Sequence, residues 1–505
     1  MFSLVRLLFL HSINNSIIMK LYLFTFLLIF SFQLNAQKLK FKIDGLSDTT
    51  IYLARYLGDR LYYADTAYSK SGTVQFSKEN YAGGVYALIC PGPKYFEFLM
   101  GDKEIEMETS LNSFIPSMKV KKSIENKLFY DYIQFINTKK REAETYKKEG
   151  EKEKLASIDK EVKAYQKKIV TENKDRLISK ILNMSIDPII PEEISKNDTL
   201  KYKFYIQHFW DNIDLSDERI VHSPVYHNKL NYFFKKLLIQ HPDTICTYAH
   251  KVIDQIKEDT DLFKYTVHFI TYNFETSKIM GMDAVFVCMA QSYYCPADDS
   301  KAFWLKQKKL VELCDKASSL EPLLIGKFAP RVILADTSEK KWIDFYSLPQ
   351  KYNLLIFWDP DCGHCKKEMP KLKKLYAQLK EKNVDIEFIG IGTNLENEKW
   401  IKFVKENKLP WLNISDFPDA NENPKKYLYE LRVTDLSSLN FRKTYDIFST
   451  PQVYLLDQEK KIIGKKLDAL TLGDLIQRIE KIELPYVEVL KTAKEEKEKQ
   501  KEKAE

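Results

Sequence analysis

Two cysteines separated by two residues stand between an apolar run and a lysine-rich, helix-like stretch. Cys362 and Cys365 enclose Gly363 and His364, and the preceding segment YNLLIFWD has the composition of a buried strand. A helix is expected over 363–382, so the pair lies where a strand passes into a helix. A structural zinc site usually needs two such pairs, and this chain has one. A static disulfide also fits poorly, because so short a ring at a helix start is strained and exposed.

A thiol-disulfide redox centre accounts for the position of both cysteines. At the first turn of a helix, unpaired N–H groups and the helix dipole favour the thiolate of Cys362, which is therefore the expected nucleophile. Cys365, one turn deeper, is placed to attack the resulting mixed disulfide and release the partner. His364 can stabilise the thiolate further, whereas Asp359 and Asp361 oppose it. The sequence leaves open which of these opposing charges has the larger effect on the Cys362 thiolate.

Changes of pattern divide the 505-residue chain into a leader and three domains. Short apolar runs between turn residues predict strands first, long amphipathic segments then predict helices, and alternating strands and helices follow. The predicted fold class is multidomain, with a β-rich N-terminal domain, a mainly α middle domain and a C-terminal α/β domain. The expected parts are a signal peptide at 1–36, the β-rich domain at 38–112, the helical domain at 113–320, the α/β domain at 321–485, and a charged tail, frayed or disordered, at 486–505.

The leader predicts export. Lys20 precedes an apolar stretch over 21–32, and Ala36 supplies a small residue for cleavage. The apolar stretch is shorter than the roughly 20 residues that a membrane-spanning helix needs, which favours a cleaved signal peptide over an anchor. Residues 1–18 add a second apolar patch, so Met19 is an alternative start. The expected location is the periplasm or cell envelope.

Five cysteines remain outside the motif. They lack regular spacing and lie in apolar or aromatic surroundings, which favours buried free thiols. A bridge between Cys288 and Cys295 is an open alternative, because connectivity cannot be deduced from sequence. The five are Cys90, Cys246, Cys288, Cys295 and Cys314.

Charge and histidine spacing exclude two classes of function. The net charge of +7 is modest, and lysines and acids are mixed without a basic stripe, so nucleic acid is a poor candidate partner. Six of the eight histidines lie in the middle domain, yet no two imidazoles share a helical face at i, i+4 and no set of acidic or cysteine ligands accompanies them. No metal site is expected there. The six are His208, His222, His227, His241, His250 and His268.

The motif and its continuation resemble the exported TlpA/ResA-like thiol-disulfide oxidoreductases of the thioredoxin superfamily. The residues that match the family's Cys-x-x-Cys-Lys-Lys-Glu site are Cys362, Cys365, Lys366, Lys367 and Glu368. The resemblance extends over about 326–482 and includes Thr450 and Pro451, which match the family's cis-proline loop. It implies a thioredoxin fold and a loop beside the disulfide that offers backbone groups to an extended substrate segment.

Glu368 and the residues before the motif distinguish this site from ordinary thioredoxin. Glu368 follows Cys365 on the same helical face, so it is expected to hold or relay the proton of that thiol. Ile356 stands where thioredoxins keep a buried acid, and Asp361 replaces their tryptophan. The expected assignments are Cys362, Cys365 and Glu368 as catalytic residues, His364 and Gly363 as tuning residues, and Thr450, Pro451 and Trp358 as substrate-binding residues.

The predicted function is that of an exported thiol-disulfide oxidoreductase that reduces protein disulfides. The Cys362–Cys365 disulfide is the expected redox group, and no separate cofactor is expected. The expected partners are protein thiols or disulfides and an upstream thiol-disulfide donor or acceptor, for which a membrane-bound protein is one candidate. Two alternatives stay open: an oxidase or isomerase, favoured by His364, and an envelope scaffold in which the first two domains act. Those two domains resemble domains found ahead of TlpA-like domains, without an activity to carry over.

Overall fold

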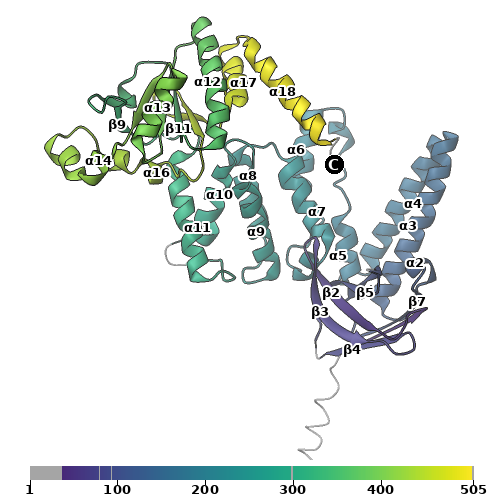
Figure 1. Cartoon of the computed structure of the whole chain (residues 1–505). Helices are drawn as coiled ribbons and strands as arrows, with labels where there is room; N and C mark the ends of the chain where they lie inside the picture. Colours follow the sequence, from purple (N-terminus) through teal and green to yellow (C-terminus); the bar gives the residue numbers. More distant parts are fainter. Residues whose placement is uncertain (1–36, 79, 93, 297–299, 503–505) are drawn as a thin grey trace, which may run out of the picture. The chain divides into compact units, whose positions relative to one another are not determined.

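A computed structural model describes residues 37–78, 80–92, 94–296 and 300–502 of the chain (Figure 1). The predicted signal peptide at 1–36 lies outside the described residues. Contacts divide the chain into two compact units, each made of two segments. The first unit holds the residues up to Leu238 together with Val252–Thr266. The second holds Ile239–Lys251 together with the residues from Val267 onward. Across the described ranges, no helix combines the length and the apolar character that crossing a membrane requires.

The first unit begins with two four-stranded sheets, ordered β4-β1-β7-β8 and β3-β2-β5-β6. Alternate residues of β1 point inward, so that Phe41 and its neighbours on the same face form the core with Phe98 of β6. The β-rich character predicted for this region is confirmed. The strands are β1 Gln37–Asp44, β2 Thr50–Leu57, β3 Arg60–Tyr68, β4 Thr73–Lys78, β5 Gly84–Cys90, β6 Lys94–Met100, β7 Glu104–Ser110 and β8 Lys119–Lys122.

Helices follow, as predicted, and are shared between the two units. The expected helical hairpin is present: α3 and α4 lie side by side (Figure 1) and meet at Gly150, whose φ of 76° ends α3 in the left-handed conformation that glycine adopts easily. The helices are α2 Phe114–Ser117, α3 Ile124–Glu149, α4 Lys152–Glu172, α5 Leu177–Met184, η2 Glu192–Ile194, α6 Asp198–His208, η3 Glu218–His222, α7 Pro224–Tyr232, η4 Phe233–Leu237, α8 Pro242–Ile253, α9 Asp261–Glu275, α10 Asp283–Met289, η5 Ala290–Tyr294, α11 Gln307–Leu320 and η6 Glu321–Leu323.

The structure corrects the expectation of free thiols among these helices. Cys246 pairs with Cys288, and Cys295 pairs with Cys314, so the prediction is wrong for these four and right for Cys90, which is free and buried. The alternative bridge between Cys288 and Cys295 is also wrong. The first pair is 42 residues apart in sequence and meets only because α8 and α10 fold together, which the spacing of cysteines along the chain does not reveal.

The C-terminal region is a seven-stranded sheet ordered β10-β9-β13-β12-β11-β14-β15 with helices on both faces, and the predicted α/β fold is confirmed here. Every residue of the central strand β11 is buried. The strands are β9 Ile333–Asp336, β10 Trp342–Asp344, β11 Tyr352–Trp358, β12 Ile386–Gly392, β13 Leu412–Ser415, β14 Gln452–Leu456 and β15 Ile462–Lys465. The helices are η7 Phe345–Ser347, α12 Gly363–Glu381, α13 Asn397–Asn407, α14 Pro418–Glu422, η8 Lys426–Glu430, α15 Leu436–Leu439, α16 Phe441–Thr444, α17 Ala469–Glu480 and α18 Pro485–Glu502.

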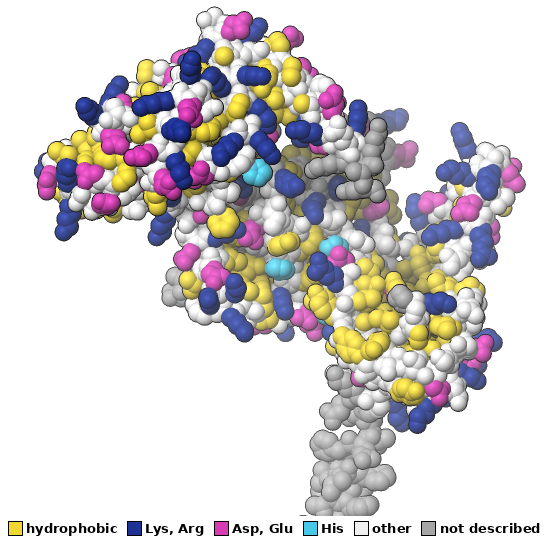
Figure 2. Space-filling model, in the orientation of Figure 1, with side chains coloured by type: hydrophobic (Ala, Val, Ile, Leu, Met, Phe, Trp, Pro, Cys, Tyr) yellow, Lys and Arg dark blue, Asp and Glu magenta, His cyan; other side chains and the backbone are white. Residues whose placement is uncertain are grey.

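The sheet has a hydrophobic core on each face. Ile356 and Trp358 of β11 pack with residues of α12, α13, α17 and α18, whereas Leu355 and Phe357 point to the other face with residues of α14, α15 and α16. The segment expected to be a frayed or disordered tail begins as helix α18, and Val487 of its first turn lies in the core. Figure 2 shows basic and acidic side chains interspersed over the visible surface, as the mixed composition predicts.

A buried ion pair joins the last helices of the middle region to the edge of this sheet. Lys465 of β15 lies 2.5 Å from the carboxylate of Asp283 at the start of α10. Its ammonium group also donates a hydrogen bond of 2.7 Å to the carbonyl of Leu323. Burial lowers the pKa of Lys465, while the charge of Asp283 opposes that change. Losing one partner of such a pair costs about 3–5 kcal/mol, so the contact fixes α10 against β15.

Candidate active site

The two motif cysteines lie at the point where β11 passes into α12. Cys362 is the residue that caps α12, and Gly363 begins the helix. The side chain of Cys362 is partly exposed, whereas Cys365 has no exposed surface. Both are free thiols in this structure. One sulfur therefore meets solvent at the helix start, and the other faces the core one turn later.

Hydrogen bonds at the helix start stabilise the thiolate of Cys362. Burial by itself would raise its pKa, but hydrogen bonds from the Thr450 side chain and from the backbone N–H groups of Cys365 and His364 outweigh burial and lower the pKa. This is the effect expected for a sulfur at the N-terminus of a helix. The groups that lower the pKa are chiefly neutral dipoles, because His364 acts here through its backbone.

The pKa of Cys365 is shifted in the opposite direction. Burial is the main cause, and it raises the pKa of Cys365 to about 12; the nearby Cys362 sulfur adds to the effect. At neutral pH the second thiol therefore keeps its proton, while the first is the more readily ionised. Such a difference is what a nucleophile and a resolving thiol require.

The loop before β14 closes the other side of the site. The peptide bond between Thr450 and Pro451 is cis, which confirms the prediction from the sequence. The Cys362 thiol donates a hydrogen bond of 3.2 Å to the Thr450 carbonyl. Phe448, two residues earlier, has a side chain that is 97% exposed, and nothing in the sequence pattern singled it out.

Glu368 is buried, and both of its carboxylate oxygens are engaged. One oxygen accepts a hydrogen bond of 2.7 Å from the N–H of Ala469, the first residue of α17, and the other lies 2.7 Å from the Lys371 ammonium. The carboxylate therefore caps α17 and holds it against α12, a contact that sequence analysis did not anticipate. Its predicted role in proton transfer to Cys365 stays a prediction.

The acidic residues before the motif have partners that reduce their effect on the thiols. Asp359 accepts hydrogen bonds from the Asp361 N–H at 2.7 Å and from the Asn394 side chain at 3.1 Å. Asp361 lies 3.3 Å from the ammonium of Lys399. Asn394 follows β12 and Lys399 belongs to α13, so their part in the site could not be found from the motif. His364 is exposed, and its imidazole is open to solvent.

Trp358 is not available to a substrate. Its side chain has no exposed surface and packs against Phe403 with ring centroids 5.0 Å apart. The predicted substrate contact is therefore wrong, because Trp358 points from β11 into the core beneath α12 rather than toward the thiols' open side. Strand alternation places Trp358 on the same inward face as Ile356.

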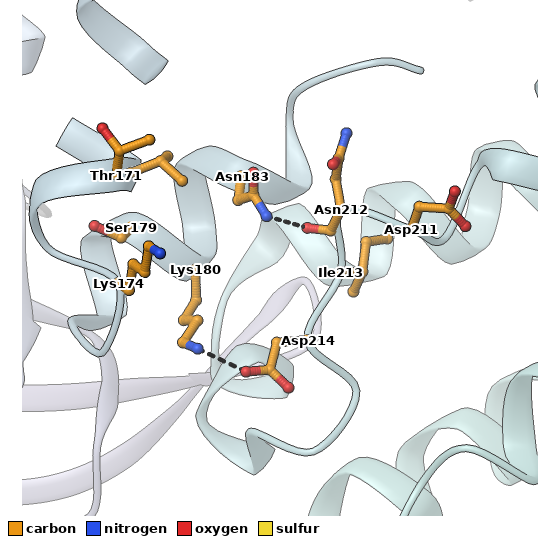
Figure 3. A pocket seen from close by; sticks show the side chains of 10 residues that line it. Thr171, Lys174, Ser179, Lys180, Asn183, Asp211, Asn212, Ile213 and Asp214 are labelled. Atoms are coloured by element: carbon orange, nitrogen blue, oxygen red, sulfur yellow. Dashed lines mark hydrogen bonds and ion pairs between the residues drawn. The ribbon is translucent and has the colours of Figure 1, made fainter. Parts of the chain in front are cut away.

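A separate pocket lies in the first unit between α4, α5 and the segment after α6 (Figure 3). Its polar groups are largely paired with one another: Lys180 lies 2.6 Å from Asp214, and the Asn183 amide donates a hydrogen bond of 2.9 Å to the Asn212 carbonyl. No cysteine or histidine lines it. The pocket therefore has no thiol among its lining residues that could take part in disulfide exchange.

Two family models match separate ranges of the chain. A thioredoxin-like family model matches residues 350–462, and a domain of unknown function, DUF5106, matches 137–320. The thiol-disulfide oxidoreductase ResA of Bacillus cereus is 31% identical over 163 residues, which are 32% of this chain and 80% of that protein. The chain belongs to the ResA-like thiol-disulfide oxidoreductases. It is thus an oxidoreductase of the thioredoxin superfamily.

Other proteins and solved structures are also similar to parts of this ResA-like chain. Sporulation thiol-disulfide oxidoreductase A of Bacillus subtilis is 25% identical over 147 residues, which are 29% of this chain and 76% of that protein. Among solved structures, a domain of a possible thiol-disulfide isomerase from Cytophaga hutchinsonii is 34% identical, with a TM-score of 0.26, and covers 32% of this chain and 96% of its own. A thioredoxin-like protein from Bacteroides caccae is 20% identical, with a TM-score of 0.41, and covers 58% and 97%.

The reduced ResA-like site should react with alkylating reagents at one sulfur. Because the pKa of Cys362 is lowered and that of Cys365 is raised to about 12, iodoacetamide should modify Cys362 at neutral pH while Cys365 stays intact. The rate at Cys362 should rise with pH and level off below the pH at which an ordinary thiol ionises. Peptide mass spectrometry across a pH series measures both rates. Equal labelling of the two cysteines would contradict the assigned roles.

Glu368→Gln should slow the resolving step by roughly 100-fold, the lower end of what a positioned base contributes. The Gln side chain can still accept the hydrogen bond from Ala469, but it cannot take a proton from Cys365. Lys371→Met is the matched control, because it removes the ion pair and leaves the carboxylate. The measurement is the rate at which a preformed mixed disulfide on Cys362 resolves, as a function of pH. An unchanged pH profile in Glu368→Gln would show that Glu368 acts only through its structural contact with α17.

Proposed function

We propose that this oxidoreductase reduces disulfides of exported proteins by dithiol-disulfide exchange through Cys362 and Cys365. The observation that carries the proposal is that the pKa of Cys362 is lowered and that of Cys365 is raised at the start of α12. The redox group is the cysteine pair itself, and no separate cofactor is needed.

The exchange takes place in two displacements. The Cys362 thiolate attacks one sulfur of the substrate disulfide, the substrate S–S bond breaks, and the released substrate thiolate takes up a proton. Cys365 then gives up its proton and attacks the Cys362 sulfur, which releases the second substrate thiol. Two electrons pass from the dithiol to the substrate, and the Cys362–Cys365 disulfide remains. A thiol-disulfide donor must then reduce this disulfide before the next cycle.

Substrate is proposed to bind along the cis-proline loop. The Thr450 carbonyl lies at hydrogen-bond distance from the reactive sulfur, so a backbone segment that pairs with this loop would carry its own sulfur to Cys362. The exposed ring of Phe448 supplies an apolar contact beside it. An extended segment that has a disulfide next to an apolar residue is the substrate that this geometry suits.

Location in the cell envelope is supported by the cysteine chemistry of the helical region. Two disulfides, Cys246–Cys288 and Cys295–Cys314, are of the kind that persists in oxidising compartments. They agree with the signal peptide expected at 1–36. We therefore place the activity in the periplasm or envelope, with a membrane-bound thiol-disulfide protein as a candidate donor.

Replacing the resolving cysteine tests the proposed pathway. Cys365→Ala should accumulate mixed disulfides with a disulfide-bonded protein substrate such as insulin, because the second displacement cannot follow the first. Cys362→Ala should form none, and the double variant controls for the other cysteines. Non-reducing gels with mass mapping of the linkage give the readout. Adducts through Cys365 or Cys90, or equal yields in all variants, would contradict the pathway.

The direction of transfer is tested by the reduction potential. Thioredoxin-like reductases lie near about −270 mV and DsbA-like oxidases near about −120 mV. A strongly stabilised thiolate makes the reduced form more stable and the disulfide more oxidising. Because neutral dipoles provide most of the stabilisation of the Cys362 thiolate, we expect this effect to be small and the potential to lie nearer the reducing end. Equilibration of the pair with glutathione or dithiothreitol buffers measures it. A value near the oxidising end would favour the alternative, an oxidase or isomerase tuned by His364.

A further inference from the structure

A second cluster of sulfur and imidazole groups lies among the helices of the second unit. Cys246 and His250 are four residues apart on one face of α8, and Cys288 of α10 faces them. The ligand atoms of these three residues all lie within 4.8 Å of one another, and each side chain is partly exposed. The sequence-based reason for expecting no metal here is therefore wrong for His250, because two cysteines do accompany it.

The histidine of this cluster is oriented in the way that metal-binding histidines are. Its Nδ1 lies 2.9 Å from the Tyr293 hydroxyl, so an Nδ1–H can donate there and leave the Nε2 lone pair free. Nε2 lies 3.5 Å from the Cys288 sulfur and 3.5 Å from the Ser292 hydroxyl. Nitrogen and sulfur ligands on one tetrahedral Zn²⁺ are separated by roughly 3.5 Å, given Zn–N and Zn–S distances of about 2.05 and 2.3 Å.

The two sulfurs are joined as a disulfide in this structure, and a disulfide is not a ligand for zinc. We propose that reduction of Cys246–Cys288 converts this cluster into a three-ligand Zn²⁺ site made of two thiolates and the His250 imidazole. A dithiol reductant supplies the two electrons and two protons that open the S–S bond and becomes a disulfide itself. The two new thiols release their protons when the cation binds. Thiol-disulfide exchange with an oxidised dithiol, which takes up the two electrons and two protons and becomes a dithiol again, re-forms the S–S bond and expels the cation.

The other disulfide of the helical region shows why the surroundings matter. Cys295 and Cys314 are also a bonded pair, but among the described residues neither belongs to a group with a third metal-ligating side chain. Thiolate and imidazole donors together favour thiophilic cations such as Zn²⁺ over Mg²⁺ or Ca²⁺. The cluster around His250 therefore has the composition of a zinc site, whereas the second pair has only that of a covalent link.

Metal titration of the full chain tests the site apart from the active-site thiols. The background is Cys362→Ser/Cys365→Ser, reduced with a phosphine, and the probes are Zn²⁺ and Co²⁺ alone. We expect one tightly bound cation per chain, a thiolate-to-Co²⁺ charge-transfer band, and no binding in the oxidised protein. Cys295→Ala/Cys314→Ala added to the background is the matched control and should bind as before.

Two milder variants keep the test valid where loss of the disulfide harms folding. His250→Gln and Tyr293→Phe both retain the cysteines, and Tyr293→Phe should weaken Zn²⁺ binding by about 10- to 100-fold, as loss of a partner of a histidine ligand does. His250→Gln should weaken it further and shift the Co²⁺ spectrum. If the reduced background binds no more Zn²⁺ than Cys246→Ala/Cys288→Ala, or if His250→Gln leaves affinity and spectrum unchanged, the proposal is wrong.

Discussion

The reactivity of this oxidoreductase depends on hydrogen bonds between the start of α12 and one sulfur. Their effect on the Cys362 thiolate exceeds the cost of partial burial and lowers its pKa, whereas burial raises the pKa of Cys365, and the two shifts together separate the acidities of the thiols. The position of the helix start follows from β11, which is buried along its whole length and paired on both sides. A strand held in this way cannot slide, so the first turn of α12 has one place to begin. The sheet therefore fixes where α12 begins, and the position of that helix end determines the acidity of Cys362.

The residues around this helix start show which parts of the site could be predicted from the sequence alone. An apolar run, a Cys-x-x-Cys pair and a helical continuation are local signals, and they predicted β11, α12 and the different exposure of the two thiols. The cis peptide bond before Pro451 also carried a local signature. The contact of Glu368 with Ala469 did not, because Ala469 stands 101 residues further along the chain. Trp358 was misassigned because closeness to the motif in sequence says nothing about the face of β11 on which a side chain lies.

Glu368 has an observed structural contact and a proposed catalytic role. Its carboxylate accepts a hydrogen bond from the first N–H of α17 and pairs with Lys371, so it holds α17 against α12. The proposed acceptance of a proton from Cys365 would use the same carboxylate. Ile356 leaves the strand beneath without an acid that could share this task.

A reductase of the kind proposed must also tolerate disulfides of its own. Cys246–Cys288 and Cys295–Cys314 lie in or beside helices, whose backbone groups are already hydrogen bonded within the helix. The proposed recognition at Thr450 requires an extended segment with free backbone groups, which a helical disulfide cannot offer without local unfolding. Selectivity would then arise from backbone conformation rather than from the sulfurs themselves. By this argument, the disulfides most open to the Cys362 thiolate are those in unfolded or misfolded chains, where extended segments are abundant.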